Sequence, residues 1–91
     1  MILGLVGKTL ESKLREAFTP ISLTVIDESA RHHGHSGARP DGESHFRVKI
    51  VARAFQGKSR VEQHRMINAV LQHELKERVH ALAIEAKAPK E

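Results

Sequence analysis

The chain has 91 residues, of which 40% are hydrophobic and 29% are charged, and its formal net charge is +4. This size and balance indicate one small globular domain and exclude an intrinsically disordered chain. No apolar run approaches the roughly 20 residues that a membrane span needs. The apolar start, residues 1–6, has no basic segment and no cleavage motif, so we expect a cytoplasmic protein with no membrane association.

Seven histidines and no cysteine set the limits on chemistry. Without cysteine there is no disulfide, no thiol nucleophile and no thiolate metal site built by this chain alone. A soft metal or an iron–sulfur cluster would need part of its ligands from another molecule. Because no nucleophile-elbow or zinc-protease motif accompanies the histidines, we do not expect an enzyme.

The hydrophobic pattern predicts an α+β fold with the element order helix, strand, strand, helix, strand. Residues 9–18 have a helical period, with Thr9 as the expected N-cap and residues 1–8 as an N-terminal extension. Residues 21–25 and 45–50 alternate as strands, and we expect them to pair as a hairpin around a long loop, residues 30–44. The sequence therefore predicts one domain over residues 1–91, with helices on one side of a three-stranded sheet.

A second helix is predicted to begin at a capping box formed by Ser59 and Glu62. Its apolar residues, Val61 among them, fall mostly on one side. The last predicted strand covers residues 79–85 and places His80 on the same face as Leu82 and Ile84. A short tail, residues 87–91, follows.

The histidines differ in what they could bind. Three of them, His32, His33 and His35, lie in a glycine-bearing loop that could adapt to an ion, although such a cluster alone is an ordinary polar loop. His64 and His73 are nine residues apart on one helix and face opposite ways, so they cannot form a joint site.

Two further histidines lie at expected strand ends. We expect His45, which opens the second strand, to orient the long loop. His80, at the start of the last strand, is on its own an ordinary strand-edge residue.

The stretch from Arg47 to Arg65 contains six basic residues and a single acid, Glu62. Nucleic acid or an acidic partner could respond to such a charge pattern. The solvated side of a strand and a helix explains the same pattern, and we favour that explanation.

Several blocks, in order along nearly the whole chain, resemble the BolA-like proteins. They are Asp27-Glu28-Ser29, Glu43-Ser44-His45-Phe46-Arg47-Val48, Phe55-Gln56-Gly57, His64-Arg65-Met66-Ile67 and Val79-His80-Ala81-Leu82-Ala83-Ile84. The resemblance implies a class II KH-like fold, which agrees with the element order above. It also implies the absence of the GxxG loop that typical KH domains use to clamp nucleic acid.

The same resemblance implies a heterodimer with a CGFS-type monothiol glutaredoxin, bridged by a [2Fe–2S] cluster. In this family the glutaredoxin cysteine and glutathione supply thiolates, and the histidine that opens the last strand, here His80, supplies a nitrogen. The second ligand comes from the loop, where His35 is preferred, then His32, and last His33. The implied role is an adaptor in iron–sulfur cluster trafficking or iron homeostasis, with no cofactor expected on the isolated chain.

Two alternatives stay open at this point. The BolA-like family also includes proteins described as DNA-binding transcriptional regulators. The residues that would contact phosphates are Arg47, Lys49, Lys58, Arg60 and Arg65, with the helix from Ser59 to Leu75 approaching a groove. A third interpretation is a structural homodimer of the isolated chain.

Overall fold

The computed structural model describes residues 3–29 and 43–90. The elements are α1 (Leu5–Phe18), β1 (Ser22–Asp27), β2 (His45–Val51), a 3-10 turn (Arg53–Phe55), α2 (Arg60–Val70), α3 (Gln72–Glu77) and β3 (Ala81–Lys87). The predicted order helix, strand, strand, helix, strand is confirmed, with the second helix divided in two.

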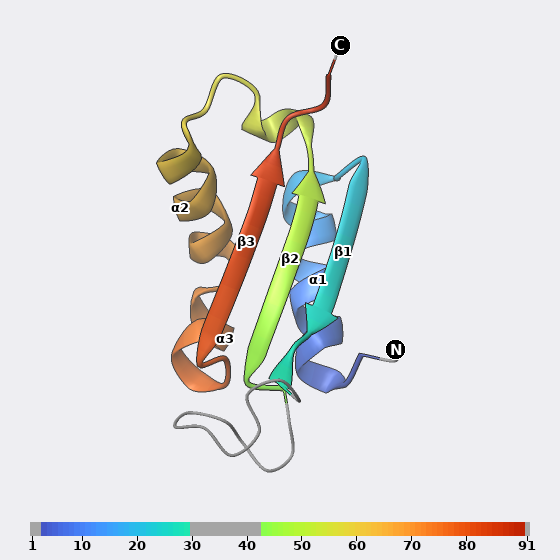
Figure 1. Cartoon of the computed structure of the whole chain (residues 1–91), viewed down its shortest axis with the longest axis vertical. Helices are drawn as coiled ribbons and strands as arrows, with labels where there is room; N and C mark the ends of the chain where they lie inside the picture. The colour runs from blue at the N-terminus through green and yellow to red at the C-terminus, as the bar shows by residue number, and fades with distance from the viewer. Residues whose placement is uncertain (1–2, 30–42, 91) are drawn as a thin grey trace.

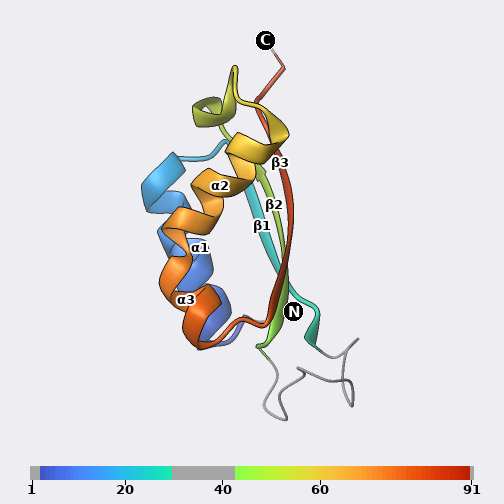
Figure 2. The same ribbon diagram turned by 90° about the vertical axis from the view of Figure 1, so that its left-hand side faces the viewer.

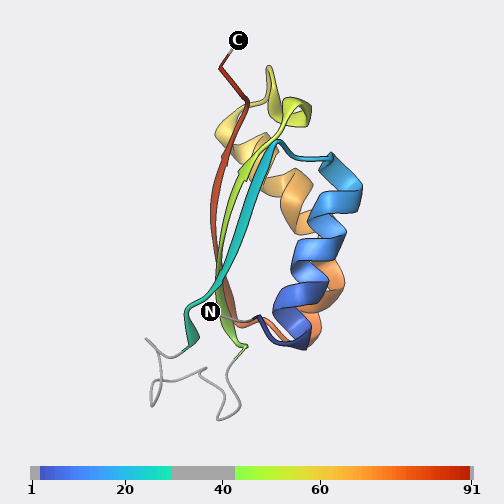
Figure 3. The ribbon, with the colours of Figure 1, turned by 90° about the vertical axis from the view of Figure 1, so that its right-hand side faces the viewer.

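The three strands form one mixed sheet with β2 in the centre. β1 pairs with β2 antiparallel, as the predicted hairpin requires, and β3 pairs with β2 parallel. All three α-helices cover the same face of the sheet, and the other face is open (Figures 1, 2 and 3). The predicted sheet with helices on one side is therefore confirmed. No helix in residues 3–29 and 43–90 is long and apolar enough to cross a membrane.

The core lies between the sheet and the helices. Alternation along β2 turns Phe46, Val48 and Ile50 toward the helices, and all three are buried. They form one cluster with buried side chains of α1 and of the α2–α3 segment, namely Leu10, Leu14, Ile67 and Leu71. At one end of this core the rings of Phe18 and Phe55 lie 5.0 Å apart.

The first helix begins earlier than its sequence pattern indicates. α1 starts at Leu5, so residues 5–8 belong to the helix and the prediction of an extension there was wrong. Thr9 is not the N-cap, because it lies inside the helix and its hydroxyl donates to the Leu5 carbonyl at 2.9 Å. The helix start is capped from a distance: the Glu43 carboxylate accepts from the N–H groups of Val6 and Gly7.

The predicted capping box at the start of α2 is confirmed. Ser59 Oγ accepts from Glu62 N–H at 3.1 Å, and Glu62 Oε1 accepts from Ser59 N–H at 2.9 Å. The hydrogen bond from the Ser59 backbone, followed by that from its side chain, lowers the pKa of Glu62. The expected continuous helix is interrupted at Leu71, whose φ of −100° and ψ of 14° separate α2 from α3. Val61, at the start of α2, is 57% exposed, whereas Ile67 and Leu71 are buried.

The last strand is displaced by two residues from its predicted limits. β3 runs from Ala81 to Lys87, so Lys87 is part of the strand and not of a tail. Leu82 and Ile84 pack against the core as predicted, whereas His80 precedes the strand and is exposed. The backbone before β3 closes the end of α3 instead of pairing in the sheet, because two consecutive N–H groups, of residues 78 and 79, donate to one helix carbonyl.

Candidate functional site

One end of the sheet gathers the ends of three elements. β1 ends there, and β2 and β3 both begin there, at the lower end in Figure 1. Extending the β1–β2 register by two residues and the β2–β3 register by one puts Ser29, Ser44 and His80 in one row across the sheet. Residues 30–42 connect Ser29 to the residue before Ser44. The topology therefore places His80 at the same end of the sheet as both ends of this connection.

The predicted loop ligands are not part of the described structure. His32, His33 and His35 all fall within residues 30–42, outside the described residues.

His80 has an exposed side chain on an anchored backbone. Its N–H donates to the Ser44 carbonyl at 2.7 Å, while its side chain lines an open hollow of about 270 Å³ formed by residues 75–80. The same hollow is lined by two basic residues, Lys76 and Arg78, and by one acid, Glu77. His80 is thus accessible to another molecule.

The backbone segment that leads into His80 is held in place by contacts with the helices. Lys13 Nζ on α1 lies 2.7 Å from the carboxylate of Glu74 on α3, and Glu74 is buried. The Glu74 carbonyl also accepts from the N–H groups of Arg78 and Val79, both at 2.8 Å. These contacts join α1, α3 and the segment that leads into His80.

Ser44 connects the components of this end. It is fully buried, and its N–H donates to Ser29 Oγ at 2.8 Å. Its carbonyl accepts from His80 N–H at 2.7 Å and from Ala81 N–H at 3.2 Å. Its hydroxyl is hydrogen-bonded to His45 Nδ1 at 2.8 Å. One residue therefore joins the end of β1, the start of β3 and the ring of His45.

His45 lies next to His80. The two ring centroids are 5.3 Å apart with an interplanar angle of 50°, and His45 is only 7% exposed. The sequence interpretation gave His45 a loop-orienting role, and its N–H does donate to Ser29 Oγ at 3.2 Å, at the start of the connection. The structure adds a contact with His80 that the sequence did not predict.

The sequence analysis assigned no role to Ser29 or Ser44. A signal was present in the hairpin, because a register that pairs Asp27 with Phe46 also brings these two serines opposite each other. Finding it would have required the exact strand pairing, which alternation alone does not give.

The donor set at this end is incomplete for a metal centre of its own. Within residues 3–29 and 43–90, no three or more His, Cys, Asp or Glu side chains come together in a way that could hold a metal ion. A single exposed imidazole on a fixed backbone does fit a centre that is completed by donors from elsewhere. His80 is such a residue.

The five predicted phosphate contacts do not form one surface. The strand register places Arg47 and Lys49 on the open face of the sheet, whereas Arg60 and Arg65 are exposed on α2, which covers the opposite face. The fifth residue, Lys58, immediately precedes the capping residue of α2.

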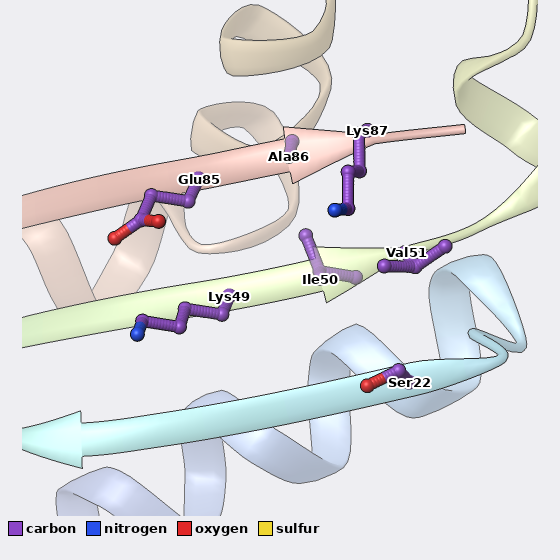
Figure 4. Close-up of a pocket in the computed structure, with 7 residues that line it drawn as sticks. All are labelled: Ser22, Lys49, Ile50, Val51, Glu85, Ala86 and Lys87. Carbon is purple, nitrogen blue, oxygen red and sulfur yellow. The ribbon is translucent and has the colours of Figure 1, made fainter. Parts of the chain in front are cut away.

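The open face carries acids beside its basic residues. Arg47 lies 3.0 Å from Glu28 through Nε and 3.0 Å from Glu85 through Nη1. These hydrogen bonds, with Glu28 the larger cause, raise the pKa of Arg47. Further along, Lys49 is the register partner of Glu85, and both border a hollow of about 200 Å³ (Figure 4). The charge of β2 is therefore largely balanced by its neighbours.

Comparison with known proteins agrees with this architecture. Residues 14–91 match the family model described as BolA-like protein. The chain is 54% identical over 85 residues to an uncharacterized protein in the cobS 5' region of Sinorhizobium sp., covering 92% of this chain and 91% of that protein. It is 42% identical over 87 residues to the DNA-binding transcriptional regulator BolA of Escherichia coli (strain K12), covering 96% of this chain and 79% of that one.

Among solved structures, the BolA domain of SufE1 from Arabidopsis thaliana superposes with a TM-score of 0.88 at 48% identity, covering 97% of this chain and 96% of that domain. The chain spans only 25% of the full-length SufE-like protein 1 of the same plant. The likeness therefore concerns the domain and not the rest of that protein. The family model, the relatives and the shared fold agree, and the chain belongs to the BolA-like protein family.

Proposed function

We propose that this chain is an adaptor that pairs with a CGFS-type monothiol glutaredoxin and shares a bridging [2Fe–2S] cluster with it. The observation that carries the proposal is the exposed imidazole of His80 at the end of the sheet where both ends of the histidine-bearing connection lie. The chain has no thiol of its own, so the partner's cysteine and glutathione would supply the thiolates. The role would lie in iron–sulfur cluster trafficking or iron homeostasis in the cytoplasm, without catalysis.

The second nitrogen in this proposal comes from residues 30–42. From Ser29, a fully extended chain reaches at most about 11 Å to His32 and about 22 Å to His35. Chain length therefore permits either residue to serve beside His80. We retain the order His35, then His32, then His33.

A bound cluster would supply iron and sulfide in a form that another protein can accept. What this chain contributes is the imidazole of His80 on an anchored backbone. Because an imidazole must be deprotonated to bind a metal, cluster retention should weaken in acid.

The test combines the chain with a CGFS glutaredoxin, glutathione, ferrous iron and sulfide under anaerobic conditions, followed by visible absorption and circular dichroism. The parent chain should give a heterodimer spectrum distinct from that of the glutaredoxin alone. His80→Ala should abolish that spectrum. His73→Ala, an exposed histidine on α3 in a different hollow, is the matched control and should leave it unchanged. The same spectrum and cluster lifetime from His80→Ala and the parent would exclude His80 as a ligand.

A second candidate function is DNA binding, which is favoured by the 42% identity to the DNA-binding transcriptional regulator BolA of Escherichia coli. For this candidate we favour α2, where Arg60 and Arg65 are exposed, because Arg47 already lies between two carboxylates. Binding through phosphates weakens steeply with salt.

We would measure duplex DNA binding by fluorescence anisotropy across a salt series. The double variant Arg60→Glu/Arg65→Glu should lose binding, whereas Arg47→Gln should lose little. Binding that does not depend on salt, or none at moderate ionic strength, would remove this candidate.

A further inference from the structure

Two imidazoles meet at the site, and only one of them is accessible. His80 is exposed, His45 is 7% exposed, and their ring centroids lie 5.3 Å apart. This separation falls in the range of about 4.5–7 Å within which aromatic rings make favourable contact. The buried ring of His45 therefore packs against one side of the exposed ring of His80.

The buried ring is itself held in place. Its Nδ1 is hydrogen-bonded at 2.8 Å to the hydroxyl of Ser44, which is fully buried. The Ser44 carbonyl accepts the N–H of His80 at 2.7 Å. Ser29 Oγ accepts from the N–H groups of both Ser44 and His45. A rotation of the His45 ring would break a buried hydrogen bond, which is unfavourable without a replacement partner.

An exposed side chain normally samples several rotamers, and fixing it on binding a metal costs conformational entropy. A neighbouring ring that is already held in place reduces this loss of conformational entropy. In metal sites, residues that orient a ligand without touching the metal affect the affinity strongly.

We propose that His45 is a positioning residue for His80. Held by Ser44, its ring keeps the exposed imidazole in the orientation from which it binds the shared cluster, and His45 is not itself a ligand. The inference rests on the function proposed above, because it concerns the same site.

The test begins with the isotope-labelled, metal-free chain. Ring ¹³C and ¹⁵N shifts of His80 and its side-chain scalar couplings report the orientation of the ring. His45→Ala, which removes the neighbouring ring, should shift the ring signals of His80 and average its side-chain couplings. His45→Phe keeps an aromatic ring but cannot hydrogen-bond to Ser44, so it should restore a single orientation only in part.

The second measurement is the lifetime of the cluster in the glutaredoxin complex. His45→Ala should shorten it by about 10-fold, and His45→Phe should shorten it less than His45→Ala does. Ser59→Ala, which removes the cap of α2 far from the site, is the control for destabilisation alone. It should leave both the His80 signals and the lifetime unchanged, with thermal unfolding used to compare the variants.

Two results would overturn the inference. If His45→Ala leaves the His80 signals and couplings as in the parent, His45 does not position the ring. If His45→Phe loses the cluster as completely as His80→Ala does, His45 is a ligand. Failure of the parent chain to form a shared cluster would refute the proposed function instead, and the signals of the metal-free chain would still decide whether His45 orients His80.

Discussion

The two ends of the sheet use polar residues in different ways. At the His80 end, Ser29, Ser44 and His45 are buried and bond to residues far away in the sequence. At the opposite end, where the chain leaves β2 for α2, Ser59 and Glu62 are exposed and bond to each other across three residues. Buried polar groups are unfavourable unless they are satisfied, so the first arrangement fixes geometry. The second marks the start of a helix.

The largest expected difference between the ends comes from single hydroxyl groups. Ser29→Ala removes the acceptor of two N–H groups at the buried end and should lower the free energy of unfolding by about 2 kcal/mol. Ser59→Ala removes an exposed cap and should cost about 1 kcal/mol. Urea unfolding of both variants measures this. Equal losses of unfolding free energy, or a larger loss from Ser59→Ala, would mean that the buried network contributes no more than a local cap.

A smaller effect is expected where the His80 end meets α1. A Cβ on Gly4 would lie 1.7 Å from Glu43 Oε1, so Gly4→Ala should push this carboxylate away from the helix start. The loss of the cap should cost about 1 kcal/mol, measured by thermal unfolding. In a double-mutant cycle with Glu43→Ala the two losses should not add, because both remove one interaction. Additive losses would show that Gly4 is needed for another reason.

The opposite end should respond to backbone conformation alone. Gly57 has a φ of +74°, and no atom lies within 4 Å of a Cβ placed there. Gly57→Ala should therefore destabilise the fold by about 1 kcal/mol through strain, and Gly57→Asn by less, since Asn tolerates this region better. Urea unfolding compares the two. Equal losses would indicate that a contact, and not φ, determines the choice of glycine.

The smallest expected effect is a dependence on acid at the capping box. The pKa of Glu62 is lower in the folded chain than its ordinary value. Its contribution to stability is therefore complete above the unfolded pKa and is lost as the pH falls through the folded pKa. Glu62→Gln should remove that part of the acid dependence when unfolding is followed from neutral pH to about pH 3. An unchanged pH profile would contradict this.

These two ends also explain how far the sequence could be interpreted. Ser59 and Glu62 were predicted because both partners of the capping box lie within one helical turn. The strand that contains Phe46, Val48 and Ile50 was predicted because alternation of apolar and polar residues can be read from neighbouring positions in the sequence. The start of α1 was predicted wrongly because its cap, Glu43, lies 37 residues away from Val6.

The candidate site shows the same difference between local sequence signals and contacts between distant residues. His80 was identified by a resemblance that includes the residues around it, but its exposure and its displacement from the strand follow from contacts with Ser44, which the chain reaches 36 residues earlier. The contact between His45 and His80 depends on the parallel pairing of β2 with β3. No periodic pattern in either segment contains that information.

The anchors around residues 30–42 have a practical consequence for protein engineering. Ser29, Glu43 and Ser44 lie outside this segment and bond to the sheet and to α1. A graft of a different connection between Ser29 and Glu43 would therefore leave the hydrogen bond from His80 N–H to the Ser44 carbonyl in place. Doubling the length of a flexible connection costs only about 0.6 kcal/mol in closure entropy. The proposed second ligand could thus be exchanged, for example for cysteine, while His80 stays in place.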